Sequence, residues 1–241
     1  MKPQSPKQIA PWFLLLSRTV LFAIFQILIA FCLTLTGSSA PWEDSAAWWT
    51  ISALLTNLVS IALLVWLFHR ENLPYFNFIP APQKTFLKDL GLTIFIFVVL
   101  APLAILPNIV LARMLFGSEE IASAMMFRPL PQWAKVASLL FPLTIAFAEL
   151  PTYFGYAMPR IEKQIGNGWL AWALASFFLA FQHTTLPLIF DGRFIVWRLG
   201  MFIPLAFTLG LSLKLRPRLF PYLMIMHALL DFTTVLMIFM L

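Results

Sequence analysis

The sequence predicts an all-α integral membrane protein, a polytopic bundle of about seven transmembrane helices. Of its 241 residues, 61% are hydrophobic and only 11% are charged, and the mean hydropathy is +0.88. A soluble domain has roughly 25% charged residues, so this composition excludes a soluble globular enzyme. Disorder is excluded because it requires low hydrophobicity. The apolar runs are long and continuous, whereas a membrane barrel has alternating strands of about ten residues, and this favours helices.

Each predicted transmembrane helix is an apolar run close to the roughly 17–25 residues needed to cross a bilayer. The seven runs cover residues 12–36, 47–68, 90–111, 134–158, 169–190, 194–213 and 219–241. Tryptophan rings prefer the membrane interface, and most tryptophans of this chain lie near the ends of these runs. The tryptophan positions therefore support the segmentation.

The first three runs form a predicted N-terminal region, residues 1–133. The run at 12–36 follows a short basic leader and is too long for the core of a signal peptide, so we expect an uncleaved anchor. An acidic loop separates it from the second run. Long loops that contain prolines, residues 70–89 and 113–133, lie on either side of the third run.

The last four runs form the predicted core, residues 134–241. The first run of this core carries Glu149, and Pro151 follows two residues later. Proline removes a backbone donor and clashes with the preceding turn of a helix. We therefore expect this helix to be kinked or locally opened beside Glu149.

Four ionisable residues lie well inside the predicted spans: Glu149, His183, His227 and Asp231. A charge at the centre of a spanning helix costs about 2.5–3.5 kcal/mol on insertion scales, so such residues indicate a function. His227 and Asp231 are four residues apart, which places them on one helix face. Glu149 and His183 lie near the middle of their own runs. We therefore expect all four to meet in one site.

Hydrolysis is the chemistry that suits these groups best. Glu149 would be the general base that activates a water, and His183 would orient the water or the base. His227 with Asp231 would stabilise the tetrahedral intermediate or transfer a proton. On this interpretation no cofactor is required.

Two other kinds of site use the same residues. Glu149, His183 and His227 are a sufficient ligand set for a catalytic zinc ion, although no His-Glu-x-x-His spacing supports it. A proton-coupled transporter would use the ionisable groups as a relay. The lack of an internal repeat speaks against a transporter built from inverted repeats.

The net charge of +6 does not indicate a nucleic-acid partner, because the basic residues are scattered through short loops. Their distribution between the two sides of the membrane predicts the orientation of the chain instead. With the N-terminus in the cytoplasm, eleven of the sixteen basic residues face the cytoplasm, Arg18 among them, and Arg198 is one of five on the other side. We therefore expect a cytoplasmic N-terminus, a C-terminus on the opposite side and the lipid bilayer as the surroundings.

The segments around the four ionisable residues resemble the motifs of the CAAX protease and bacteriocin-processing family, which includes the type II CAAX prenyl endopeptidases. That family carries Glu-Glu-x-x-x-Arg, Phe-x-x-x-His and His-x-x-x-Asn or Asp on separate membrane helices. The corresponding segments here are residues 149–156, 179–183 and 227–231. Leu150, Phe154 and Leu179 stand where the family has its second glutamate, its arginine and its phenylalanine.

The resemblance implies a CAAX-protease-like fold in the last four spans and an intramembrane protease activity. The substrate would be a membrane-anchored protein or peptide, and the implied catalytic residues are Glu149, His183, His227 and Asp231. The missing glutamate and arginine leave a second expectation. A member with weakened or lost activity would bind or stabilise another membrane protein.

Overall fold

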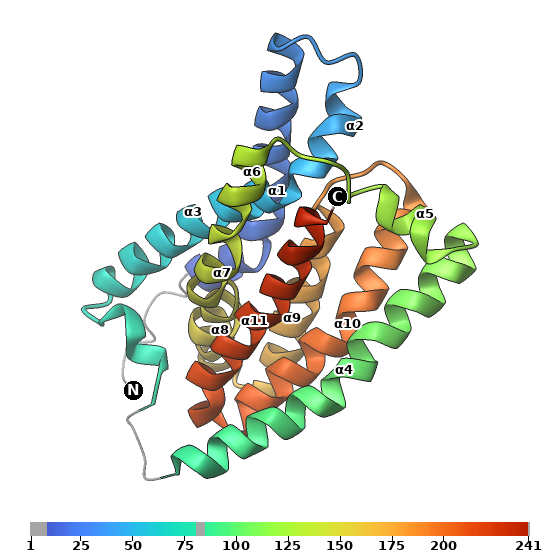
Figure 1. Cartoon of the computed structure of the whole chain (residues 1–241). Coiled ribbons are helices and arrows are strands. Elements are labelled where there is room, and N and C mark those ends of the chain that lie inside the picture. The colour runs from blue at the N-terminus through green and yellow to red at the C-terminus, as the bar shows by residue number, and fades with distance from the viewer. Residues whose placement is uncertain (1–8, 81–84, 241) are drawn as a thin grey trace.

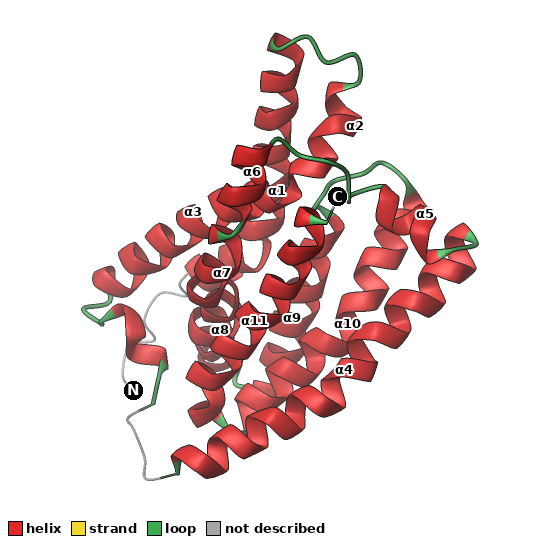
Figure 2. Ribbon diagram, in the orientation of Figure 1, coloured by secondary structure: helices red, strands yellow, loops and turns green. Residues whose placement is uncertain are grey.

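The computed structural model describes residues 9–80 and 85–240, and every regular element in this part of the chain is a helix (Figure 1 and Figure 2). The predicted basic leader lies outside the described residues. The longer helices are α1 (Ala10–Leu35), α3 (Trp49–Arg70), α4 (Phe86–Phe116), α7 (Leu140–Leu150), α9 (Gly168–Phe181), α10 (Gly192–Leu215) and α11 (Phe220–Phe239). The shorter helices are α2 (Pro41–Ser45), α5 (Glu119–Ala124), α6 (Gln132–Ser138) and α8 (Met158–Ile165).

Six helical segments among the described residues are long and apolar enough to cross a membrane, so the chain is an integral multi-pass membrane protein. In chain order they are Ala10–Leu35, Pro41–Arg70, Phe86–Phe116, Gln132–Ile165, Gly192–Leu215 and Pro217–Phe239. They correspond to six of the seven predicted runs. The second segment joins α2 to α3, and the fourth joins α6, α7 and α8.

The fifth predicted run, residues 169–190, forms a shorter helix than expected. Helix α9 has 14 residues and passes at Phe181 into a 3₁₀ turn, Gln182–Thr184, and then into an irregular segment that ends at Asp191. At about 1.5 Å per residue, α9 is roughly 21 Å long, less than the ~30 Å of bilayer hydrocarbon. A continuous helix is prevented because Pro187 cannot donate a backbone hydrogen bond.

Side chains of neighbouring helices satisfy the irregular backbone after α9. The Gln26 amide of α1 donates to the carbonyl of Leu188 at 2.9 Å and accepts from its N–H at 2.6 Å. Arg198 of α10 donates to the carbonyls of His183 and Leu186. Non-helical backbone at membrane depth is tolerated only where the protein itself provides such partners. Helices α1 and α10 therefore allow the segment that carries His183 to leave the helical path.

The helix that carries Glu149 opens locally, as its prolines predict. Helix α7 ends at Leu150, and residues Pro151–Ala157 form a π-helical turn that leads into α8. Pro151 lacks the N–H that a regular helix would use, and a π-turn takes up the displaced backbone. Glu149 thus lies one residue before the end of the regular part of this span.

The buried apolar side chains form two clusters, each built from several helices. Leu14 of α1 and Leu223 of α11 belong to the first cluster, whereas Phe22 of α1 and Val235 of α11 belong to the second. Helices α1 and α11 therefore run in the same direction between the two clusters. The start of α1 and the end of α11 consequently lie toward opposite ends of the bundle (Figure 1).

A layer of buried polar side chains lies between the two apolar clusters. Its members are no more than 8% exposed and come from five different elements. They are Arg18, Asn57, Ser60, Glu149, Gln182, His183 and His227.

Candidate active site

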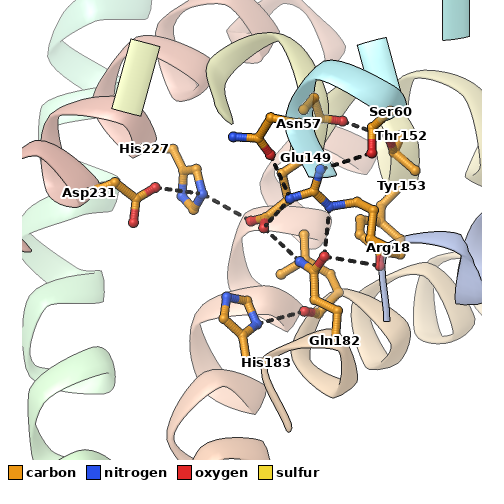
Figure 3. Close-up of polar contacts among 12 residues, drawn as sticks. Arg18, Asn57, Ser60, Glu149, Thr152, Tyr153, Gln182, His183, His227 and Asp231 are labelled. Atoms are coloured by element: carbon orange, nitrogen blue, oxygen red, sulfur yellow. Dashed lines mark hydrogen bonds and ion pairs between the residues drawn. The ribbon is translucent and has the colours of Figure 1, made fainter. Parts of the chain in front are cut away.

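Three of the four predicted residues form a continuous chain of contacts (Figure 3). The carboxylate of Glu149 is 1% exposed, and its Oε1 lies 3.0 Å from Nε2 of His227. The same Nε2 lies 3.4 Å from Oδ2 of Asp231, one helical turn further along α11. The i, i+4 spacing predicted that second contact, and the structure confirms it. The side chain of Asp231 is 24% exposed, so this row of contacts leads from the core toward the surface of α11.

His183 lies close to this chain but makes no direct hydrogen bond to its members among the described residues. Its Nδ1 is 2.9 Å from the carbonyl oxygen of Leu179, one turn earlier. A carbonyl only accepts hydrogen bonds, so the neutral ring carries its proton on Nδ1 and keeps Nε2 as an acceptor. The ring stacks on Phe202 of α10, with centroids 3.6 Å apart. Figure 3 shows the imidazole on the same side of Glu149 as His227.

Arg18 of α1 is the largest component of the site that the sequence analysis did not assign to it. Its guanidinium is fully buried, and Nη2 lies 3.6 Å from Oε2 of Glu149. Gln182 donates from Nε2 to the same Oε2 at 2.6 Å. The charge count places Arg18 among the basic residues that face the cytoplasm, and this is wrong because Arg18 lies in the buried layer. A single cation inside the first apolar run was the signal, since buried charges require a partner.

The charge count places Arg198 among the basic residues that face the outer side, and this is wrong too. Its side chain is 5% exposed and holds the backbone around His183. The guanidinium also lies over the ring of Phe202, 4.9 Å from the centroid. Arg198 therefore fixes His183 from two directions, through its backbone and through the ring that stacks on it.

Four buried polar atoms at this site make no hydrogen bond of regular geometry among the described residues, although Nε2 of His227 lies 3.0 Å from Oε1 of Glu149 and 3.4 Å from Oδ2 of Asp231. They are Oε1 of Glu149, both ring nitrogens of His227 and Oδ2 of Asp231. Most buried polar atoms in proteins are satisfied, so a cluster of unsatisfied atoms calls for an explanation. These atoms are suited to bind a small polar group such as a water, because they combine two carboxylate oxygens with an imidazole.

The residues that depart from the family motifs have packing roles. Leu150 is fully buried in the apolar core, and Phe154 is 3% exposed. The Phe154 ring lies against Gly210 of α10, whose missing side chain makes room for it. Phe154 therefore occupies apolar space where the motif would have an arginine. The guanidinium beside Glu149 belongs to Arg18 of α1.

The zinc alternative, with Glu149, His183 and His227 as ligands, gains no support from the described residues. Within residues 9–80 and 85–240, no group of three His, Cys, Asp or Glu side chains is placed to hold a metal ion. One oxygen of Glu149 already accepts from Gln182, and Nδ1 of His183 faces a backbone carbonyl.

Comparisons of the chain with protein-family models, with curated proteins and with solved structures give no match.

Proposed function

We propose that the chain is an intramembrane endopeptidase that resembles the CAAX proteases and cleaves a membrane-associated protein or peptide with a water activated by Glu149. The observation that supports this most is the row of contacts from Oε1 of Glu149 through Nε2 of His227 to Oδ2 of Asp231, in buried surroundings. A carboxylate and an imidazole 3.0 Å apart are the groups that general acid–base hydrolysis needs. No serine or cysteine is required as a nucleophile.

The reaction begins when Oε1 of Glu149 takes a proton from the bound water. The water oxygen attacks the peptide carbonyl carbon and forms a tetrahedral intermediate. The imidazolium of His227, balanced by Asp231, stabilises the negative oxygen of that intermediate. When the C–N bond breaks, the proton held by Glu149 passes to the leaving amine. His183 keeps Nε2 available as an acceptor that orients the water.

We place the N-terminus in the cytoplasm. Without the buried Arg18 and Arg198, fourteen of the sixteen basic residues remain, and ten of these fall on the side of the N-terminus. This asymmetry follows the excess of positive charge that cytoplasmic loops carry. The C-terminus then lies on the opposite side.

Purified protein reconstituted with a library of peptides and membrane-anchored fragments tests the activity. The isosteric variant Glu149→Gln should lower the cleavage rate at least about 100-fold, because general-base catalysis contributes roughly 10²–10⁴. Glu162→Gln is the matched control, since that side chain is 47% exposed and 4.0 Å from Lys214. Equal cleavage by wild-type protein and Glu149→Gln would show that Glu149 is not the base.

A second function is favoured by the second oxygen of Glu149, which is fully engaged by Gln182 and Arg18. Such a network also suits a member that keeps the fold, lacks activity and binds another membrane protein. Co-purification of an intact stoichiometric partner, unaffected by His227→Ala, would support this function. Recovery of a processed substrate from cells would exclude it.

A further inference from the structure

We propose that Arg18 is the positioning residue that holds Glu149 in its ionised form and divides the roles of its two oxygens. Oε2 is anchored by Arg18 and Gln182, and Oε1 is left to face His227. The first span would then be part of the catalytic unit. This inference deepens the proposed hydrolysis, because a general base must be ionised before it can take a proton from water.

The hydrogen-bond donors around Oε2 require an acceptor. The guanidinium of Arg18 has only hydrogen-bond donors, and its Nε donates to the side-chain oxygen of Gln182 at 2.7 Å. This contact fixes which end of the Gln182 amide faces Arg18. The hydroxyl of Tyr153 donates to the same amide oxygen at 3.3 Å. The amide nitrogen of Gln182 must therefore point away from Arg18, and it donates to Oε2 of Glu149. Arg18 thus acts on Glu149 twice, through its charge and through the orientation of this amide.

The guanidinium is itself held in place by α3. Nη2 of Arg18 donates to Oδ1 of Asn57 at 2.9 Å, and Nη1 donates to the hydroxyl of Ser60 at 3.2 Å. The amide nitrogen of Asn57 donates to the hydroxyl of Thr144 on α7 at 3.0 Å, so its oxygen is the atom that faces Arg18. The guanidinium also lies over Phe22, 5.2 Å from the ring centroid. Side-chain oxygens of Gln182, Ser60 and Asn57 thus all accept hydrogen bonds from the guanidinium.

Charge balance leads to the same conclusion. The side chains of Arg18 and Glu149 are 0% and 1% exposed, and buried charges are stable only when they are paired. A protonated Glu149 would leave the guanidinium without an anion. The other titratable side chains around Glu149 are His183, His227, Asp231 and Tyr153, which lie on the turn after α9, on α11 and on the π-turn.

Infrared difference spectroscopy tests the ionisation directly and needs no substrate. Subtracting the spectrum of Glu149→Gln from that of the wild type should show the antisymmetric stretch of a carboxylate. The same subtraction in an Arg18→Gln background should show the C=O stretch of a carboxylic acid, and an Arg18→Lys background should keep the carboxylate band. Arg193→Gln is the control, because Arg193 is exposed and pairs with Asp191.

Two results would overturn the inference. One is a carboxylic acid band for Glu149 in the wild type, a result that can be obtained even if no Arg18 variant folds. The other is a carboxylate band in the Arg18→Gln background. In the cleavage assay, Arg18→Gln should lower kcat about 100-fold with little change in KM, and Arg18→Lys should recover part of it. Wild-type protein without any cleavage would count against the proposed function alone, since the infrared result would still decide the role of Arg18.

Discussion

Breaking the buried pair between Arg18 and Glu149 should destabilise the bundle far more than breaking an ion pair at its surface. Arg18→Met leaves the Glu149 carboxylate, 1% exposed, without its cation. Removing one partner of a buried ion pair typically costs about 3–5 kcal/mol, because the remaining group must either stay charged without its partner or be neutralised by taking up a proton. Glu149→Gln should cost a similar amount, since it leaves the buried guanidinium without its anion.

The double variant Arg18→Met/Glu149→Gln should cost less than the sum of the two single variants. Residues in contact within one network show interaction free energies of about 0.5–3 kcal/mol, and this pair lies at the centre of its network. For a chain of this size, 1 kcal/mol corresponds to roughly 2–4 °C in Tm, so each single variant should lower Tm by roughly 6–20 °C. Thermal unfolding in detergent, followed by tryptophan fluorescence, measures all three.

Arg113→Met provides the matched control for this cycle. It breaks the pair with Glu119, in which the two side chains are 66% and 36% exposed, and such surface pairs are worth about 0–1 kcal/mol. A Tm shift for Arg18→Met no larger than that of Arg113→Met would refute the reasoning. So would strict additivity in the double variant, because it would mean that the two buried charges do not stabilise each other.

Two further predictions concern the packing and the pH dependence of the bundle. Gly210→Ala should cost about 1–3 kcal/mol, because the new methyl group would meet the hydroxyl of Ser176 and lie 2.7 Å from a ring carbon of Phe154. Thermal unfolding measures this cost. If adding Ser176→Ala to the Gly210→Ala variant restores stability, the clash with the Ser176 hydroxyl is its cause. A Gly210→Ala variant as stable as the wild type would contradict the prediction. At the end of α3, burial raises the pKa of Glu71, but the hydrogen bonds donated by Arg160 and by a tyrosine outweigh it and leave the pKa below the ordinary 4.5. The interaction should stabilise the bundle above about pH 4.5 and lose its effect as the pH falls through the lowered pKa. The difference in Tm between the wild type and Glu71→Gln should therefore be largest near pH 7 and shrink in acid. A difference that does not change with pH would contradict this prediction.

Much of the candidate site could be predicted because its signals are local. The cost of burying charge identifies Glu149 and Asp231 as exceptional among the acidic residues, and helical periodicity brings His227 to Asp231. Pro151 likewise acts on its own helix, and the opening beside Glu149 follows from the missing backbone donor. Each of these inferences needs only residues within a few turns of one another.

The errors in the sequence analysis have a common physical origin. Hydropathy predicts one span at residues 169–190, but the segment leaves the helical path after Phe181. Gln26 and Arg198 make this possible because they provide hydrogen bonds to the irregular backbone around Pro187. The charge count places Arg18 at the cytoplasmic surface because its neighbours in sequence do not reveal its buried partners. In each case the deciding contact is made by a side chain from another helix.

The sequence by itself determined that this chain is a multi-pass helical membrane protein and which ionisable residues are costly enough to require a role. Composition and periodicity suffice for this, because each helix must satisfy its own backbone in lipid. Only the tertiary structure decided that Glu149 meets Arg18 from the first helix, Gln182 from the turn after α9 and His227 from the last helix. Which helices become neighbours depends on the packing of all their faces together, and no local pattern of residues contains that information.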